Sequence, residues 1–313
     1  MIRNSAPEVS RGAGGFAALL LLVLAAMISS CSQNPTGYID DPVVHAVNFD
    51  PAWSPDGVRI AYRHYAQSPE EQKDGYEQIW IGTITSAGEF VTRGVSPAWA
   101  PDGNSLVFIR DGDIWRRELD SGTETRLTSS GSCFTPACSP DGIHIAFRMQ
   151  DHTPDAAGDS AGIWMIDVRT LQRRQLTVHV GSDPSWSQNG AQIAISAPLA
   201  SSSLYDEIAL IDTVMSVPRR LTFNAMSDQE PAWSPGGNTI AWYASGEGAS
   251  PLSGIWLMNV DGTSQHLLIR TGGYPSWSPD GKFIVYGSFN NRTHVQSLWI
   301  AGSDGKGARE LPY

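Results

Sequence analysis

The sequence PAWSPDG at residues 51–57 is the first of six copies of one short pattern. The other copies are PAWAPDG (97–103), PACSPDG (136–142), PSWSQNG (184–190), PAWSPGG (231–237) and PSWSPDG (275–281). Successive copies begin 39–48 residues apart, which is the spacing of blades in a β-propeller. Within the pattern, proline presets φ, aspartate bonds the nearby backbone and glycine accepts a positive φ. Each copy therefore predicts a strand that ends in a tight turn.

The residues after each turn predict three further strands. An alternating segment follows directly, as at 59–62 and 105–108, and a loop leads to a second apolar segment. That segment contains Ile-Trp in four copies, at 79–80, 114–115, 163–164 and 255–256. A last segment closes the unit, as at 125–128, 174–177 and 219–222. We therefore predict an all-β fold, a six-bladed β-propeller of four-stranded antiparallel blades over residues 43–313.

Ten of the 11 tryptophans occupy two positions of this repeat, five before the turn and five in the third strand. Flat, bulky side chains suit the space between twisted sheets, so we interpret them as core residues rather than as a carbohydrate platform. Cys138 takes the tryptophan position of the third copy and is expected to be a small core residue. Cys133 lies too far from it for a disulfide in extended chain, about 16 Å, so we expect two structural thiols.

Two segments compete to close the ring. Residues 308–311 (AREL) follow the last third strand and predict the outer strand of blade six. Residues 43–49 stand at the equivalent offset before the first turn and could cover the same edge. One of them has to do so, because an open propeller exposes an unpaired strand.

The first 30 residues are expected to be a signal peptide. Their apolar run, 16–28, is shorter than the roughly 20 residues that span a membrane. The sequence Ser29-Ser30-Cys31 resembles the lipobox of bacterial lipoproteins, which implies cleavage before Cys31 and acylation of that residue. An ordinary signal peptide followed by an incidental cysteine is the alternative. Residues 31–42 are polar and contain two prolines, so they predict a flexible tether.

The six turns and their Ile-Trp strands resemble the TolB-like propeller family over nearly all of residues 43–313. This resemblance implies a propeller around a central channel in an exported protein of the bacterial envelope. The same blade type occurs in tricorn-like proteases and dipeptidyl-peptidase-type enzymes, so it indicates fold more specifically than function. TolB carries an α/β domain ahead of its propeller, whereas about a dozen residues separate Cys31 from the first blade here. That difference argues against direct equivalence with TolB.

Composition excludes several classes of protein. The 313 residues are 41% hydrophobic, enough for a sizeable core, and only 17% charged, too few for a long coiled coil. The formal net charge of −11 argues against a nucleic-acid partner, because little positive charge is present to replace the counterions of a phosphate backbone.

Little in the sequence predicts catalysis. Residues 158–162 (GDSAG) fit the pattern GxSxG, but a loop precedes them and a predicted blade strand follows, whereas a nucleophile elbow needs a strand and then a helix. The seven histidines are scattered, without an HExxH motif, so we expect no metal and no other cofactor. We therefore predict that the chain is not an enzyme.

Loop lengths predict the binding face. From the first-strand to the third-strand tryptophan position the chain runs 16–27 residues, and the variation falls in the loop between strands two and three. Variable loops on one face of a propeller usually mark its binding face. On that face we place Arg63, Tyr65, Arg110, Arg148 and Tyr243 as candidate binding residues, with Asp50, Asp183 and Glu230 at the channel mouth, and His64, His152 and Tyr205 nearby. The alternative is that these are ordinary solvated residues.

The predicted function is that of a non-catalytic binding or scaffold propeller of the bacterial cell envelope. Lipidated Cys31 would hold it at a membrane, on the periplasmic face of the outer membrane or at the cell surface. The expected partner is an envelope protein segment or a polar envelope ligand at the loop face, and the chain is expected to be a monomer. The alternative is a lyase or hydrolase that acts on a polysaccharide or peptide in the channel.

Overall fold

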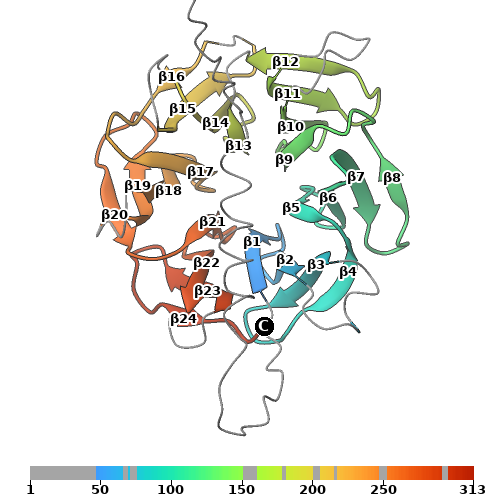
Figure 1. Cartoon of the computed structure of the whole chain (residues 1–313), viewed down its shortest axis with the longest axis horizontal. Coiled ribbons are helices and arrows are strands. Elements are labelled where there is room, and N and C mark those ends of the chain that lie inside the picture. The colour runs from blue at the N-terminus through green and yellow to red at the C-terminus, as the bar shows by residue number, and fades with distance from the viewer. Residues whose placement is uncertain are drawn as a thin grey trace, which may run out of the picture. The chain divides into compact units, whose positions relative to one another are not determined.

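The computed structural model describes residues 47–65, 70, 76–150, 161–177, 181–199, 205–214, 217–246, 252–290 and 295–313. Contacts divide the chain into residues 1–43 and 44–313, and all described residues belong to the second unit. That unit is an all-β propeller of six four-stranded antiparallel sheets arranged around an axis (Figure 1). The predicted fold class is therefore confirmed.

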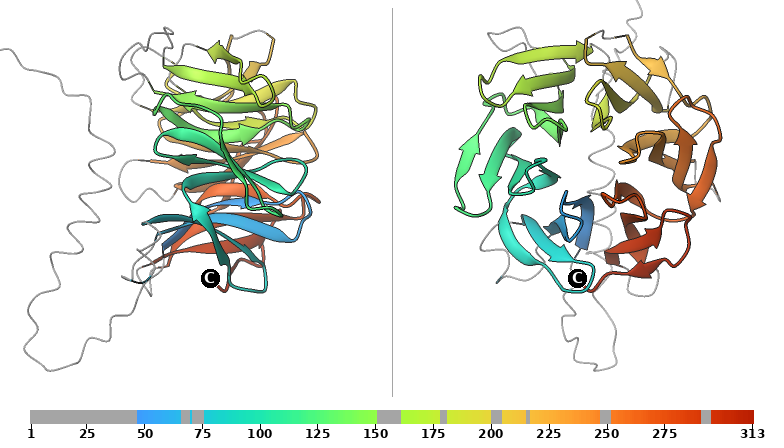
Figure 2. Two further views of the ribbon diagram at one scale, coloured as in Figure 1. Left: turned by 90° about the vertical axis from the view of Figure 1, so that its right-hand side faces the viewer. Right: turned by 180° about the vertical axis from the view of Figure 1, so that it is seen from behind.

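Each blade uses four strands that follow one another in the chain, with the first strand innermost (Figures 1 and 2). The first three blades comprise β1 (Val47–Trp53), β2 (Arg59–Tyr65), β3 (Glu77–Thr83), β4 (Glu89–Arg93); β5 (Val95–Trp99), β6 (Ser105–Arg110), β7 (Asp113–Glu118), β8 (Glu124–Arg126); β9 (Cys133–Cys138), β10 (His144–Met149), β11 (Gly162–Asp167), β12 (Arg173–Thr177). The last three comprise β13 (Ser182–Trp186), β14 (Gln192–Ala197), β15 (Glu207–Asp212), β16 (Arg219–Arg220); β17 (Ser227–Trp233), β18 (Thr239–Ser245), β19 (Gly254–Asn259), β20 (His266–Ile269); β21 (Gly273–Trp277), β22 (Phe283–Asn290), β23 (Val295–Gly302), β24 (Arg309–Glu310).

The repeated heptapeptide forms the turn between the first two strands, as predicted. In blade one, Gly57 at φ +74° donates its N–H to the Ser54 carbonyl at 3.0 Å. The Asp56 carboxylate accepts the Val58 N–H at 2.7 Å, so the turn satisfies its own polar groups. These turns and those between the third and fourth strands share one face of the propeller, which we call the turn face; the opposite face is the loop face.

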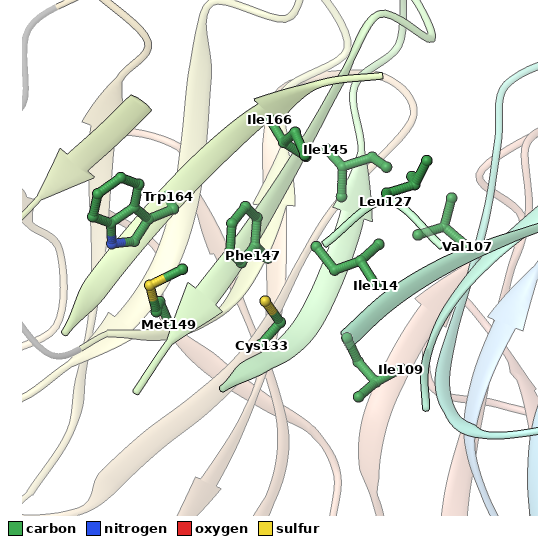
Figure 3. Close-up of a cluster of buried hydrophobic side chains, with 10 residues drawn as sticks. All are labelled: Val107, Ile109, Ile114, Leu127, Cys133, Ile145, Phe147, Met149, Trp164 and Ile166. Carbon is green, nitrogen blue, oxygen red and sulfur yellow. The ribbon is translucent and has the colours of Figure 1, made fainter. Parts of the chain in front are cut away.

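The hydrophobic core lies between neighbouring blades rather than in one central mass. One cluster joins Ile109 and Ile114 of blade two to Ile145 and Phe147 of blade three (Figure 3). The motif tryptophans pack in such seams, as expected: Trp99 is 7% exposed and bonds the preceding blade through Nε1, 3.0 Å from the Ala52 carbonyl.

The two internal cysteines are structural thiols, as predicted. Cys133 and Cys138 are both free and occupy opposite ends of β9. Cys138 packs against the cluster between blades two and three, in the tryptophan position of its motif. Burial raises the pKa of the Cys138 thiol to about 12, which makes it unreactive at ordinary pH.

Among the described strands, each blade is built from one continuous part of the chain, so the ring closes without exchange of strands between its ends. Arg309–Glu310 is the outer strand of blade six, which confirms the first of the two closing segments. Val47–Phe49 instead belongs to β1, the inner strand of blade one, and residues 43–46 lie outside the described residues. Side chains therefore join blade six to blade one.

Two further predictions fall outside the described residues, namely the signal peptide and the tether with Cys31. Among the described residues, the structure has no helix that is long and apolar enough to cross a membrane.

Candidate functional site

One residue of every inner strand has an unusual backbone conformation. It stands directly before the motif proline, at a β-bulge, and its φ lies between +44° and +56°. These six residues, which we call the axial ring, are Asp50, Ser96, Thr135, Asp183, Glu230 and Tyr274. Non-glycine residues rarely adopt positive φ, and such conformations cluster at functional sites. The bulge therefore removes the same residue of each inner strand from the regular pattern of strand pairing.

The three acidic members of the axial ring influence one another's protonation. Asp50 belongs to blade one, whereas Asp183 and Glu230 belong to blades four and five on the other side of the axis (Figure 1). Burial, with the charges of Asp183 and Asp50, raises the pKa of Glu230 to about 8. The three acids thus stand at the equivalent position of three inner strands around the propeller axis, and their charges affect one another's pKa.

Burial also raises the pKa of the two aspartates. The pKa of Asp50 is about 6, although the positive charge of Arg63 opposes the rise. The pKa of Asp183 is raised despite hydrogen bonds from Ser182 Oγ at 2.7 Å and Ser196 Oγ at 3.1 Å. Of the three acids, Glu230 therefore has a pKa above neutral and keeps its proton near pH 7, whereas Asp50 loses its proton near pH 6.

Arginines face two of these carboxyl groups from the neighbouring strands. Arg63 stacks over Phe49 with its guanidinium carbon 4.4 Å from the ring centroid, and it forms an ion pair with Glu77. Arg148 holds the same position in blade three, 5.5 Å over Phe134, and its charge opposes the rise in the pKa of Asp183. Stacking on phenylalanine keeps each guanidinium beside the axial ring.

Two tyrosines and one glycine of blades five and six lie near Glu230. Tyr274 donates its backbone N–H to Glu230 Oε2, and its side chain is 37% exposed. Gly273 makes room for this contact, because a Cβ there would lie 2.9 Å from the same oxygen. Tyr243 lies close enough for Glu230 to raise its pKa, after the larger effect of burial.

The structure thus brings together six of the predicted binding residues: Asp50, Arg63, Arg148, Asp183, Glu230 and Tyr243. The sequence analysis missed Ser96, Thr135 and Tyr274. Their signal was available, because each directly precedes the proline of its motif, as the three acids do.

The other candidates occupy different places. Arg110 ties blade two to blade one, because it bonds Glu124 of its own blade at 2.8 Å and Thr92 of β4 in blade one at 2.6 Å. His64 is buried and bonds Asn48 at 2.8 Å, so it is a core residue rather than a rim residue. Tyr65 lies at the end of β2, with its ring 5.9 Å from that of Tyr76.

Tyr205 is half-buried just before β15, and His152 lies outside the described residues. Residues 158–160 of the GxSxG pattern also lie outside them. Its last residue, Gly162, begins β11, where a Cβ would lie 2.0 Å from the Thr177 carbonyl oxygen, so that glycine has a packing role. Across the described ranges, no three His, Cys, Asp or Glu residues are grouped so that they could hold a metal ion.

Comparison with known proteins identifies the class. The profile of the TolB β-propeller domain matches residues 95–313, more than half of the chain. The chain therefore belongs to the TolB β-propeller family.

Curated relatives share only part of their length with this chain. It is 32% identical over 145 residues to a TolB homologue of Chlorobium luteolum, covering 45% of this chain and 31% of the relative. It is 26% identical over 207 residues to the uncharacterized peptidase YuxL of Bacillus subtilis, covering 62% and 29%. The chain thus spans about three tenths of the length of these relatives.

Solved structures confirm the fold. TolB from Acinetobacter baumannii superimposes with a TM-score of 0.67 at 20% identity, covering 93% of this chain and 68% of that one. An oligogalacturonate lyase in complex with manganese gives a TM-score of 0.58 at 14% identity, with coverage of 85% and 77%. Since proteins with both kinds of name share this fold, function has to be argued from the residues of this chain.

Proposed function

We propose that this protein is a non-catalytic binding propeller of the bacterial envelope. Its axial ring receives a segment of an envelope protein from the loop face. Lipidation at Cys31 would keep the propeller at the membrane.

The arrangement of the axial ring carries this proposal. Three acidic residues hold the same bulged position in the inner strands of three blades, and Arg63 and Arg148 stack on Phe49 and Phe134 of inner strands. A polypeptide supplies both of the groups that such a site can bind, backbone N–H donors for carboxylates and carbonyl acceptors for guanidinium groups. Raised pKa values add to the argument, since partly desolvated carboxyl groups with few partners gain more from a bound ligand than solvated ones.

Site-specific photocrosslinking tests the proposal in the native envelope. A benzophenone amino acid replaces Tyr274 in the full chain, and a second variant carries it at Lys282, an exposed residue of the turn face. We expect the probe at position 274 to capture one defined envelope protein. No capture at 274, or the same product from 282, would contradict the proposal.

The acidic ring is then changed with its backbone preserved. Asp50→Asn, Asp183→Asn and Glu230→Gln are combined in the variant that carries the probe at Tyr274. Asparagine tolerates positive φ, whereas alanine at these positions would add backbone strain. We expect the crosslink to fall about tenfold, and Asp261→Asn, in an exposed turn, to leave it unchanged. Equal crosslinking by the triple variant would show that the carboxyl groups do not contribute to binding of the partner.

A further inference from the structure

The seam between blades one and two contains an internal arginine socket on the turn face. Arg59, the first residue of β2, places its guanidinium carbon 4.7 Å from the ring centroid of Trp99 in the next blade. Its Nε donates to Asp56 Oδ2 at 2.7 Å, and its Nη2 donates to the Gly103 carbonyl. An indole face, a carboxylate and a carbonyl thus surround one guanidinium group.

The seam between blades three and four repeats this socket. Asp141, Trp186 and Gly190 occupy the motif positions of Asp56, Trp99 and Gly103. The local bonds match as well: His144 N–H donates to Ser139 Oγ at 2.9 Å, as Arg59 N–H donates to Ser54 Oγ at 3.0 Å. The two seams therefore present the same three groups in the same local fold.

The second seam differs in the residue that fills the socket. His144 stands where blade one has Arg59, and its side chain is much shorter. Here the structure has a pocket of about 410 Å³, lined among others by Asp141, His144, Trp186 and Gly190. The bonds that Asp141 accepts from Ser139 and Ile143 fall on Oδ1, whereas in blade one the guanidinium uses Oδ2.

We infer that this pocket binds an arginine side chain of a protein partner. The guanidinium stacks on Trp186 between the Asp141 carboxylate and the Gly190 carbonyl, as Arg59 does in its own seam. An arginine suits the pocket better than a lysine, because a planar guanidinium stacks on indole and donates in two directions at once. The site lies on the turn face, so the inference goes beyond the proposed function and does not depend on it.

Arg174 is the cation that already lines this pocket. Its Nη2 donates to the carbonyl of Thr213 in blade four at 2.6 Å. That bond ties its guanidinium to the turn after β15. Arg174 therefore forms a wall of the pocket, while Asp141 supplies the opposite charge.

The test uses the indole N–H signals of the full chain in detergent, labelled with ¹⁵N-tryptophan. Trp186 Nε1 donates to the Ala137 carbonyl at 3.0 Å, and the variant Trp186→Phe assigns its signal. The probe is N-acetyl-arginine amide, and the matched control is N-acetyl-citrulline amide, which has the same shape without the charge. We expect a saturable shift of the Trp186 signal with the arginine probe and binding at least about tenfold weaker with citrulline.

Two substitutions taken from the chain's own repeats locate the site. Asp141→Asn keeps the turn, because Asn189 stands at that position in blade four and accepts the same backbone bond at 3.0 Å. His144→Arg places a guanidinium group of the chain itself in the pocket, as Arg59 does in the first seam. We expect the first to weaken binding about tenfold, and the second to abolish it while raising the melting temperature.

A third variant supplies a positive control. Arg59→Ala empties the native socket, so the Trp99 signal should then respond to the same probe. If the Trp99 signal of Arg59→Ala responds but the Trp186 signal does not, an emptied socket can bind the probe. The pocket beside Trp186 then does not bind it, and the inference is wrong. Equal shifts with citrulline, or a Trp186 shift that persists in His144→Arg, would also overturn the inference.

Discussion

At the scale of single residues, the repeats show which substitutions accompany one another. In blades two and four the residue directly before the isoleucine of the third strand is an acid, Asp113 or Glu207, and both are 1% exposed. In those two blades the fourth strand carries an arginine that pairs with the acid, Arg126 and Arg220 respectively. Blades three and five begin the third strand with glycine and have glutamine or leucine at the arginine position. At this position of the repeat, among these four blades, a buried acid thus occurs together with an arginine partner.

Glu230 gives the first residue-scale prediction, because its pKa differs between folded and unfolded protein. The folded pKa of about 8 lies above the ordinary value of 4.5, so the folded state holds a proton that the unfolded chain releases between these values. The stability that this proton contributes is complete below about pH 4.5 and is lost as the pH rises through 8. We expect Glu230→Gln to leave the melting temperature nearly unchanged at pH 4.5 and to raise it by about 2–4 °C at pH 9.

Glu124 provides the control of opposite sign. Burial opposes its ionisation, but hydrogen bonds from Arg110, Thr92 and Arg117 outweigh burial and lower its pKa to about 2. Its contribution is therefore present above about pH 4.5 and lost as the pH falls toward 2. Glu124→Gln should lower the melting temperature at both pH 4.5 and pH 9. The same pH profile in both variants would show that the axial ring does not shift the pKa of Glu230.

At the scale of elements, the strands could be predicted from sequence because each turn carries its own chemistry. Proline, aspartate and glycine at fixed positions set the end of the first strand, and alternation sets the second. The fourth strands were harder to place. β16 and β24 have two residues each, and only a few bonds to the third strand define them.

The seam between blades six and one is the element-scale feature that sequence did not predict. Within the described residues, no chain segment crosses this seam, and Tyr313 bridges it through its side chain. Its ring stacks on Tyr62 at 4.7 Å between centroids, and its hydroxyl donates to the Thr83 carbonyl at 2.6 Å. Gly82 lies directly beneath, where a Cβ would be 2.5 Å from the Tyr313 ring. A tyrosine at position 313 shows no periodicity, so its role emerges only from the closed ring.

We predict that Tyr313 stabilises this closure. Tyr313→Ala should lower the free energy of unfolding by roughly 2–4 kcal/mol, through lost stacking and a cavity in the seam. Tyr313→Phe should cost about 1 kcal/mol, for the lost hydrogen bond alone. Urea unfolding measures both, and hydrogen exchange should show faster opening of β24 and β4 in the alanine variant. Tyr76→Ala, at a tyrosine that is 54% exposed, should change little; an equal loss from that variant would contradict a special role for Tyr313.

At the scale of the whole molecule, the candidate site could be predicted only in part. The acids of the axial ring stand out in the sequence because they precede the motif proline, and positive φ then gives them a common orientation. Arg63 and Arg110 look alike in sequence, yet one faces the axial ring and the other bonds Glu124 within its blade. Neighbouring strand residues point to opposite faces of a sheet, so one step of register decides whether an arginine lies beside the axial ring or pairs with an acid of its own blade.

The sequence predicts that a lipid at Cys31 holds the whole molecule at a membrane. Cys31 lies outside the described residues, so the anchor rests on the sequence alone. An acyl chain contributes about 0.8 kcal/mol for each buried CH₂ group, and one chain anchors only reversibly, whereas two or more anchor durably. We expect the parent protein to remain in the membrane fraction after a high-salt wash and to incorporate labelled fatty acid. Cys31→Ala should lose the label and become soluble, while the triple variant of the axial ring stays bound. If Cys31→Ala remains with the membranes and is still cleaved normally, the anchor is not a lipid at this cysteine, and the propeller must be held by a protein contact instead.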